Sequence, residues 1–351
     1  MKGVAPLTTN TKGIKMNKVI LACGEGGKLT RELIEQNIIP FFDNDILRTL
    51  TDSAVLGSLG NGEIAFTTDS YIVSPLFFPG GDIGTLSISG TVNDLSVCGA
   101  KPIALSFAMI VEEGFEISDL KKIIESASNV AKKANVKIVA GDTKVLPKGK
   151  GDQIFINTSG IGVIEKNRKM DDKFIKEGDL IIVSGPIAKH GATIAALRHN
   201  LKSKELYSDC APLNELIDTL FEKGIKPKSL HDPTRGGVAT LLNEVARRTN
   251  LGILIEEEKI PVSSDVKGVC EILGLDPLYL ASEGRFVGFF APKEAEKAVE
   301  ILNQNEFGKG ASIIGIVTKK TSDLFPVVMK TALGSLRPID ELSGLQLPRI
   351  C

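Results

Sequence analysis

The sequence has no pair of cysteines at CxxC spacing, no surplus of charge of either sign and no long apolar run. Its five scattered cysteines indicate neither a zinc site nor a disulfide framework, so a reducing cytoplasm is the expected compartment. The 42 basic residues balance 43 acidic ones, which provides no electrostatic footprint for nucleic acid or an anionic membrane. No stretch is long and apolar enough to predict a membrane span. Small molecules or proteins are therefore the expected partners.

The length of the chain predicts two domains. With 351 residues, 42% of them hydrophobic, the chain can form two separate cores. Residues 1–17 are polar and lack the apolar core of a secretory signal, so we expect a disordered leader, with Met16 as an alternative start. The charged segment 165–178 predicts a boundary between a first domain at 18–165 and a second at 178–332.

The C-terminal segment 333–351 contains glycine and proline but no sustained apolar period, so it predicts a loosely held, mobile arm. If extended, fifteen to twenty residues reach about 50 to 65 Å. The arm ends on Cys351, and because nothing follows that residue, we expect an exposed thiol on a swinging carrier. The alternative is a frayed terminus with an accidental cysteine. Cys270, by contrast, lies at helical spacing with apolar residues, which favours a core position.

The first half of the chain alternates strand and helix patterns. Residues 63–71 predict a strand that ends near Asp69, and a loop at 75–82 leads into a helix. On that helix a small polar stripe is formed by Ser87, Thr91, Asp94 and Cys98. A carboxylate on a stripe of small residues leaves room for a ligand, while a solvated acid is the alternative.

The rest of the first domain contains one further polar cluster. A strand at 103–111 precedes an amphipathic helix with Ser118 as its expected N-cap. A buried strand at 136–140 is then expected to deliver Asp142, Thr143 and Lys144 in a turn at its end, before a strand at 153–164 closes the domain.

Three loops of the chain have the composition of anion sites or acidic sites. The glycine cluster before Lys28 allows backbone N–H groups to approach phosphate, but it lacks the spacing of a phosphate loop and also fits a plain mobile loop. The segment His231–Gly237 opens a helix and predicts an anion site, unless Asp232 or Thr234 serves only as an N-cap. Glu283 lies in a turn before a strand at 286–291, where a surface glutamate is the ordinary alternative.

The remaining elements of the second domain follow from apolar patterning. Strands are expected at 179–184, 312–317 and 325–329, and helices at 190–201, 213–221 and 293–303. Carboxylates recur at turns in both domains, whereas histidine and cysteine clusters do not occur. This pattern suits Mg²⁺ and a nucleoside triphosphate better than zinc or iron.

Six segments carry a family resemblance that covers the chain from about Lys18 to Cys351: TTDSYIVSPLFFPGGDIG, GTVNDLSVCGA, GDTKV, HDPTRGGV, ASEGR and the terminal LPRIC. They closely resemble the hydrogenase maturation factors of the HypE family, the carbamoyl dehydratases. That family belongs to a superfamily with aminoimidazole ribonucleotide synthetase, selenophosphate synthetase and thiamine-monophosphate kinase. The shared acids and glycines fit any of these enzymes, but the Pro-Arg-Ile-Cys terminus distinguishes the HypE family. The leader before Met16 is the only departure.

The resemblance implies an α/β (α+β) fold of two domains like that of aminoimidazole ribonucleotide synthetase. It also implies a homodimer formed through the first sheet, ATP held where the halves meet, and a mobile tail. In this family the terminal cysteine receives a carbamoyl group from a HypF-type carbamoyl transferase, and ATP-dependent dehydration converts it to a thiocyanate. The cyano group passes to iron on a HypC–HypD complex during assembly of nickel-iron hydrogenase.

Positions that match the family's motifs become candidate site residues. The resemblance implies Cys351 as the carrier, with Lys144 and Glu283 orienting the carbamoyl group and moving its protons. Four acids are candidate ligands of Mg²⁺ and phosphate: Asp69, Asp94, Asp142 and Asp232. The further candidates for binding ATP are Gly26, Gly27, Lys28, Thr143, Thr234 and Arg235.

Two other functions fit parts of the sequence. A different enzyme of the superfamily would phosphorylate a free small molecule and would not need Cys351. A non-catalytic scaffold that senses ATP would release no phosphate. A first-domain sheet of about four short strands with one helical face would leave an apolar face, which predicts a homodimer in either case.

Overall fold

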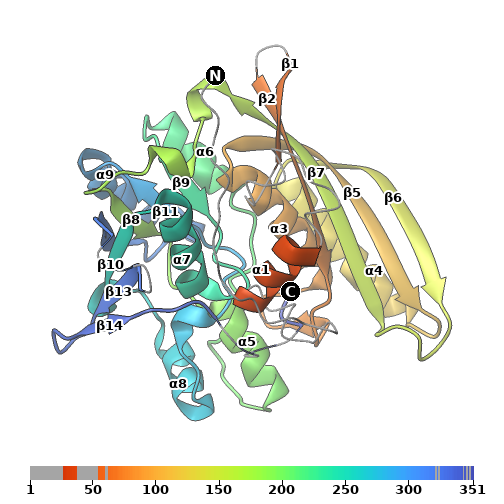
Figure 1. Ribbon diagram of the computed structural model, residues 1–351. Coiled ribbons are helices and arrows are strands. Elements are labelled where there is room, and N and C mark those ends of the chain that lie inside the picture. The colour runs from red at the N-terminus through yellow and green to blue at the C-terminus, as the bar shows by residue number, and fades with distance from the viewer. Residues whose placement is uncertain are drawn as a thin grey trace.

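The computed structural model describes residues 27–37, 54–59, 62–320, 322, 325–342, 344, 347 and 349–351. The predicted leader at 1–17, Cys23 and Gly26 lie outside these residues. Figure 1 shows two halves, each built on a β-sheet, with α3 (Ile83–Val97) packed between them. The short helix α1 (Lys28–Asn37) lies beside Leu342 of the C-terminal segment.

The first sheet has the strand order β1-β2-β7-β5-β6. Its strands are β1 (Ala54–Leu59), β2 (Gly62–Tyr71), β5 (Ala100–Glu112), β6 (Lys137–Leu146) and β7 (Ile154–Glu165). All neighbours are antiparallel except β5 and β6, which run parallel. The sheet thus has five strands of up to 13 residues, where about four short ones were expected. A small hairpin, β3 (Phe77–Phe78) with β4 (Gly81–Asp82), precedes α3.

Helices α3 and α4 (Ile117–Lys133) pack on one face of this sheet, as alternating burial along β7 requires. Asp82 caps α3 by accepting a hydrogen bond from the backbone N–H of Thr85 at 2.8 Å. The predicted core residues Leu86, Val92 and Leu95 are fully buried. Two small polar side chains of α3 are buried on different sides: the hydroxyl of Thr91 lies against Thr158 of the sheet, and the amide of Asn93 lies against the second domain.

Two local predictions in this domain are wrong. Ser118 lies inside α4, and Glu116 occupies the N-cap position, because its carbonyl already accepts hydrogen bonds from the N–H groups of Asp119 and Leu120. The strand predicted at 136–140 is not a buried strand, since β6 is an exposed edge strand. The segment Gly141–Lys144 continues the ladder opposite Phe107–Ile110, so it lies within β6 and not in a turn.

The second sheet has the strand order β14-β13-β10-β12-β8-β11-β9. Its strands are β8 (Leu180–Val183), β9 (Ser229–His231), β10 (Gly252–Glu256), β11 (Val287–Phe290), β12 (Ser312–Thr318), β13 (Val327–Lys330) and β14 (Leu336–Pro338). Its helices are α5 (Lys189–Arg198), α6 (Asn214–Glu222), α7 (Gly237–Thr249), α8 (Ser264–Leu273) and α9 (Pro292–Asn303). The strands and helices predicted for this half are confirmed to within a few residues.

The connection between the halves contains the 3₁₀ turns η3 (Lys166–Arg168) and η4 (Asp172–Phe174). Three further turns lie in the second half: η5 (Glu257–Lys259), η6 (Pro277–Tyr279) and η7 (Glu306–Gly308). One core cluster contains residues of both halves, such as Tyr71 and Ile83 together with Ile181 and Val183. None of the helices in the described part of the chain is long and apolar enough to cross a membrane.

The C-terminal segment differs from the expected loose arm. Its first part forms β14, which extends the second sheet, and its end returns to the first domain, where Leu347, Ile350 and Cys351 are buried. Cys351 is only 8% exposed, so the prediction of an unshielded thiol is wrong for this position of the tail. The N–H groups of Ile72 and Ser74 donate hydrogen bonds to main-chain carbonyls of the tail and hold it in this buried position. Cys270 is buried on α8, as predicted.

Candidate active site

The two domains meet around α3, and Asn93 joins them. Its side-chain amide donates hydrogen bonds to the carbonyls of Ala211 and Glu283, both at 3.1 Å. Its side-chain oxygen accepts one from the N–H of Leu213 at 2.8 Å. A single buried amide therefore fixes two segments of the second domain against the first.

Acids of the first domain gather at this junction. The hydroxyl of Thr67 donates to Asp94 Oδ2 at 2.8 Å, and Asp69 lies on the same strand as Thr67. Burial raises the pKa of Asp69, although the positive charge of Arg235 from the second domain opposes this rise. Burial, with the charges of Asp69 and Asp94, raises the pKa of Tyr71 well above its ordinary value. Asp69 and Asp94 thus lie close enough together to act on the same buried tyrosine.

Glu283 is a buried acid and not the surface glutamate that its sequence position would ordinarily suggest, since only 3% of it is exposed. Burial raises its pKa well above the ordinary value, and the negative charges of Asp232, Asp209 and Asp69 raise it further. Among the described residues, no hydrogen-bond partner reaches Glu283 Oε1 or Asp209 Oδ2. Two carboxyl oxygens are therefore buried at the junction without a hydrogen-bond partner in the described protein.

Asp209 was not predicted as a site residue. Its Oδ1 accepts a hydrogen bond from the backbone N–H of Glu283 at 3.1 Å, and Arg285 Nε lies 3.9 Å from its Oδ2. Asn93 was missed as well, although it lies within one of the recognised segments. Nothing in the local pattern around Asp209 separates it from a surface acid, because its contacts come from residues more than 70 positions away.

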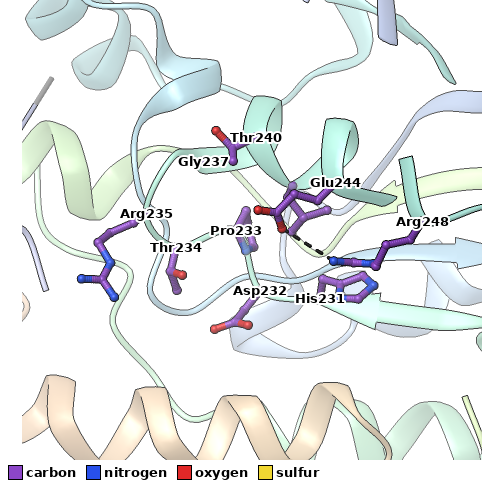
Figure 2. A pocket seen from close by; sticks show the side chains of 10 residues that line it. His231, Asp232, Pro233, Thr234, Arg235, Gly237, Thr240, Glu244 and Arg248 are labelled. Atoms are coloured by element: carbon purple, nitrogen blue, oxygen red, sulfur yellow. Dashed lines mark ion pairs between the residues drawn. The ribbon is translucent and has the colours of Figure 1, made fainter. Parts of the chain in front are cut away.

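The loop before α7 lines a cavity of about 90 Å³. In Figure 2, Asp232 extends toward α3 at the foot of the view, Thr234 points into the same space, and Arg235 projects from the far end of the loop. Neither Asp232 nor Thr234 caps α7, because Gly236 occupies the N-cap position with a left-handed φ of 80°. Both residues lie beside the N-terminus of α7, which favours anions.

A set of charged groups anchors the start of this loop. His231 Nε2 lies 2.8 Å from Asp172 Oδ1, and Arg248 donates to Asp172 Oδ2 at 2.7 Å. Burial would raise the pKa of Asp172, but the hydrogen bond and charge of His231, the charge of Arg248 and the hydroxyl of Ser229 hold it below the ordinary range. The Asp172 carboxylate thus ties β9 and α7 together beneath the cavity.

Three predicted site residues lie away from the junction of the two domains, on the edge strand β6. Asp142, Thr143 and Lys144 are exposed on β6, where the ammonium of Lys144 donates to Asp142 at 2.7 Å. This hydrogen bond lowers the pKa of Asp142. Since β6 is three strands from β2, about 14 Å across the sheet, these side chains do not join Asp69 within one chain.

The predicted glycine cluster is described only from Gly27 onward. The backbone N–H of Lys28 donates to the carbonyl of Leu342 in the tail at 3.2 Å. A Cβ added to Gly27 would lie 2.1 Å from that same carbonyl oxygen, so only glycine allows this approach. Gly27 and Lys28 thus contact the tail segment at Leu342.

No group of three or more histidine, cysteine, aspartate or glutamate side chains within the described ranges is arranged to hold a metal ion. Mg²⁺ needs fewer protein ligands, because one or two carboxylates with phosphate oxygens and water complete its shell. Asp69 and Asp94 could form such a pair, since both of their charges act on Tyr71 and raise its pKa. Asp232 is the candidate from the second domain.

The tail brings Cys351 to the end of β2. The N–H of Ile72 donates to the carbonyl of Cys351, and the N–H of Ser74 donates to that of Arg349, both at 3.2 Å. The strand that carries Asp69 therefore leads directly into the segment that receives the terminal cysteine.

The chain is similar to known proteins over nearly its full length. The profile of the AIR synthase related protein N-terminal domain matches residues 50–164, and that of the C-terminal domain matches residues 176–325. The carbamoyl dehydratase HypE of Cupriavidus necator is 41% identical over 339 residues, which cover 96% of each protein. The matching chain of a solved HypE–HypF complex has a TM-score of 0.82 at 48% identity, covering 88% of this chain and 99% of that one. A solved HypE in complex with ATP has a TM-score of 0.79 at 42% identity, covering 93% and 98%.

Proposed function

Because this chain belongs to the HypE family of carbamoyl dehydratases, within the AIR synthase related proteins, we propose that it dehydrates a carbamoyl group carried on its own Cys351. The reaction consumes ATP and leaves a thiocyanate, which supplies the cyanide ligand for the iron of nickel-iron hydrogenase. The observation that carries this proposal is the docking of the terminal cysteine at the end of β2, where the acids of both domains meet.

The chemistry explains the need for ATP. The oxygen of a thiocarbamate is a poor leaving group, so transfer of the γ-phosphoryl group to it, with loss of one N–H proton, gives a phosphorylated imidate. Cleavage of the carbon–oxygen bond then releases phosphate, and loss of the second N–H proton leaves the carbon–nitrogen triple bond. Glu283 is suited to proton transfer, because its raised pKa lets it hold a proton and makes its ionised form a stronger base than an exposed glutamate.

The ATP phosphates would lie against the α7 N-terminus. Thr234 and Arg235 present a hydroxyl and a positive charge there, and Gly26, Gly27 and Lys28 are proposed to approach the nucleotide from the first domain. Mg²⁺, held by one or two of the candidate acids Asp69, Asp94 and Asp232, would neutralise phosphate charge.

A homodimer would complete the site. The face of the first sheet opposite α3 and α4 exposes Phe66, Ile110 and Ile161, so a second copy would cover apolar surface. By strand alternation Asp142 and Lys144 project from the same face as Ile110. We therefore propose that Asp142 and Lys144 serve the site of the second copy, where Lys144 would orient the carbamoyl group and Asp142 would supply a further metal ligand. By the same alternation Thr143 projects from the other face of β6.

The proposed working domains are 18–165 for ATP binding and dimerisation and 178–332 for the remainder of the site. Residues 333–351 would act as a mobile tail that also reaches outward. A HypF-type carbamoyl transferase would load Cys351, which the HypE–HypF complex of the relatives supports, and a HypC–HypD complex would accept the cyanide. We propose a cytoplasmic setting for this set of partners.

The test is the mass of the intact protein, starting from the carbamoylated form and adding MgATP. We expect the loss of one water from the peptide that contains Cys351, together with phosphate release. Cys351→Ala should abolish carbamoylation and leave ATP binding intact, whereas Cys270→Ala, at a cysteine buried on α8, serves as the matched control.

Three outcomes would count against the proposal. A carbamoyl or cyano group mapped to Cys23, Cys98, Cys210 or Cys270 would overturn the role of Cys351. Phosphorylation of a free small molecule by a protein without residues 333–351 would favour another enzyme of the superfamily. Absence of phosphate release from the carbamoylated protein would favour an ATP-sensing scaffold.

A further inference from the structure

We propose that His190 and Arg198, both on α5, form a dock that holds the C-terminal tail by its main chain, and that they position Cys351 for dehydration. The positioning of Cys351 for dehydration rests on the proposed function, whereas the dock itself is a property of the fold. Neither residue belongs to the acids and loops described above, and both side chains contact the last three residues of the chain.

His190 is a buried donor directed at the tail. Its Nε2 lies 2.7 Å from the carbonyl oxygen of Ile350, and because a carbonyl only accepts, Nε2 carries the proton. The other nitrogen, Nδ1, lies 2.8 Å from the hydroxyl of Ser208 and accepts from it. The ring also packs edge-on against Phe78, with centroids 5.3 Å apart. Its orientation is therefore fixed, and departure of the tail would remove the carbonyl that accepts from its buried N–H.

Arg198 joins the tail to the segment after β2. Its Nη2 donates to the carbonyl of Arg349 at 2.6 Å, while its Nε donates to the carbonyl of Ser74 at 2.8 Å. The two carbonyls belong to neighbouring main-chain segments that also bond to each other. A planar guanidinium can satisfy both at once, which the single ammonium of lysine does less well.

The tail's last three carbonyls all accept hydrogen bonds from the rest of the protein. Arg198 and the N–H of Ser74 reach residue 349, His190 reaches residue 350, and the N–H of Ile72 reaches Cys351. Arg349 adds a side-chain hydrogen bond to the carbonyl of Ile72 at 3.0 Å and an ion pair with Asp152.

Because these hydrogen bonds are made to main-chain carbonyls, they do not depend on which chemical group is attached to the sulfur of Cys351. A thiol, a thiocarbamate and a thiocyanate leave the same carbonyls in place. The dock therefore accepts the tail in each chemical form, and selection between forms must come from the groups around the sulfur.

The experiment measures how fast iodoacetamide alkylates Cys351, followed by peptide mapping of the unloaded full-length protein. Arg198→Ala and His190→Ala should each raise the rate at Cys351 by roughly tenfold, since each removes a buried or charge-assisted hydrogen bond. The buried Cys210 and Cys270 report unfolding in the same sample. Lys189→Ala is the matched control on α5, because the ammonium of Lys189 lies over Tyr207 and not against the tail.

Conservative variants separate positioning from folding. His190→Gln retains a donor toward Ile350 and an acceptor for Ser208, so it should restore most of the protection that His190→Ala loses. In single-turnover dehydration, Arg198→Ala should lower the rate roughly tenfold without changing the ATP concentration at half-maximal rate.

Parent-like alkylation of Cys351 in both alanine variants would overturn the dock. Alkylation of Cys210 together with Cys351 would mean that the alanine variant unfolds, and His190→Gln then decides. A rate at Cys351 like that of the parent in His190→Gln supports the dock. A fast rate at Cys351 in His190→Gln, with Cys210 still protected, contradicts it. If the alanine variants are alkylated faster at Cys351 but the parent protein shows no dehydration, the dock is supported and the proposed function is rejected.

Discussion

At the scale of single residues, the site is defined by acids that the fold buries together. Glu283 and Asp209 are both buried, and the negative charge of Asp209 helps to raise the pKa of Glu283. The folded protein therefore retains a proton on Glu283 that the unfolded chain releases near its ordinary pKa of about 4.3. The contribution of this proton to stability is fully present below that pKa and is lost as the pH rises through the higher folded pKa.

Glu283→Gln should remove this pH dependence, because glutamine has no proton to release. As the pH rises above the ordinary pKa of about 4.3, the unfolding free energy of the parent should fall relative to that of the variant, as denaturant titrations at each pH would measure. Dehydration should be abolished. The companion variant Asp209→Asn should move the acidic limb of the dehydration rate to lower pH, because it lowers the pKa of Glu283. An equal pH slope for the parent, Glu283→Gln and the exposed control Glu300→Gln would contradict the assignment.

At the scale of elements, α3 is the helix on which both domains pack, and its contact with α4 depends on a glycine. A Cβ added to Gly84 would lie 2.2 Å from the carbonyl oxygen of Ile123 on α4. Gly268 on α8 has nothing within 4 Å of the same position. The two helical glycines therefore form a matched pair: packing leaves no room for a side chain at Gly84, whereas Gly268 has open space for one.

Gly84→Ala should destabilise the protein by about 1–3 kcal/mol, since the added methyl group overpacks the contact between α3 and α4. Gly268→Ala should stabilise it by about 0.5–1 kcal/mol, because alanine reduces the entropy of the unfolded chain and favours helix. Denaturant midpoints at constant slope would measure both changes. Equal effects of the two substitutions would show that the close approach at Gly84 is not a constraint.

At the scale of the whole molecule, one chain leaves β6 and the open face of the first sheet exposed. A homodimer formed through this face explains the exposed apolar side chains and places Asp142 and Lys144 where a second copy can use them. The parent should therefore behave as a dimer in light scattering at micromolar concentration.

Ile161→Asp, on the open face of the central strand β7, should yield a folded monomer with lost dehydration, because a buried charge at the interface is strongly unfavourable. Ile272→Asp on α8 is the control, since Ile272 is exposed on the second domain and should leave the dimer intact. A monomeric parent, or a dimeric Ile161→Asp variant, would remove the proposed role of Lys144 at a neighbouring site.

The sequence by itself determined the family and most of the elements. The strands near 63–71 and 153–164, the helix that begins after Asp82, the loop before α7 and the core position of Cys270 all follow from local patterns, because apolar periodicity and capping act within a few residues. The segment motifs, including the terminal cysteine, indicated the family that the relatives confirm.

Only the tertiary structure decided which side chains are buried and which acids meet. The burial of Glu283 beside Asp209, the exposure of β6 and the burial of Cys351 depend on contacts between residues 70 to more than 270 positions apart. Local periodicity gives the apolar side of an element, but it cannot specify which distant segment covers that side. The tail illustrates this limit, because main-chain carbonyls hold it, and every sequence has those.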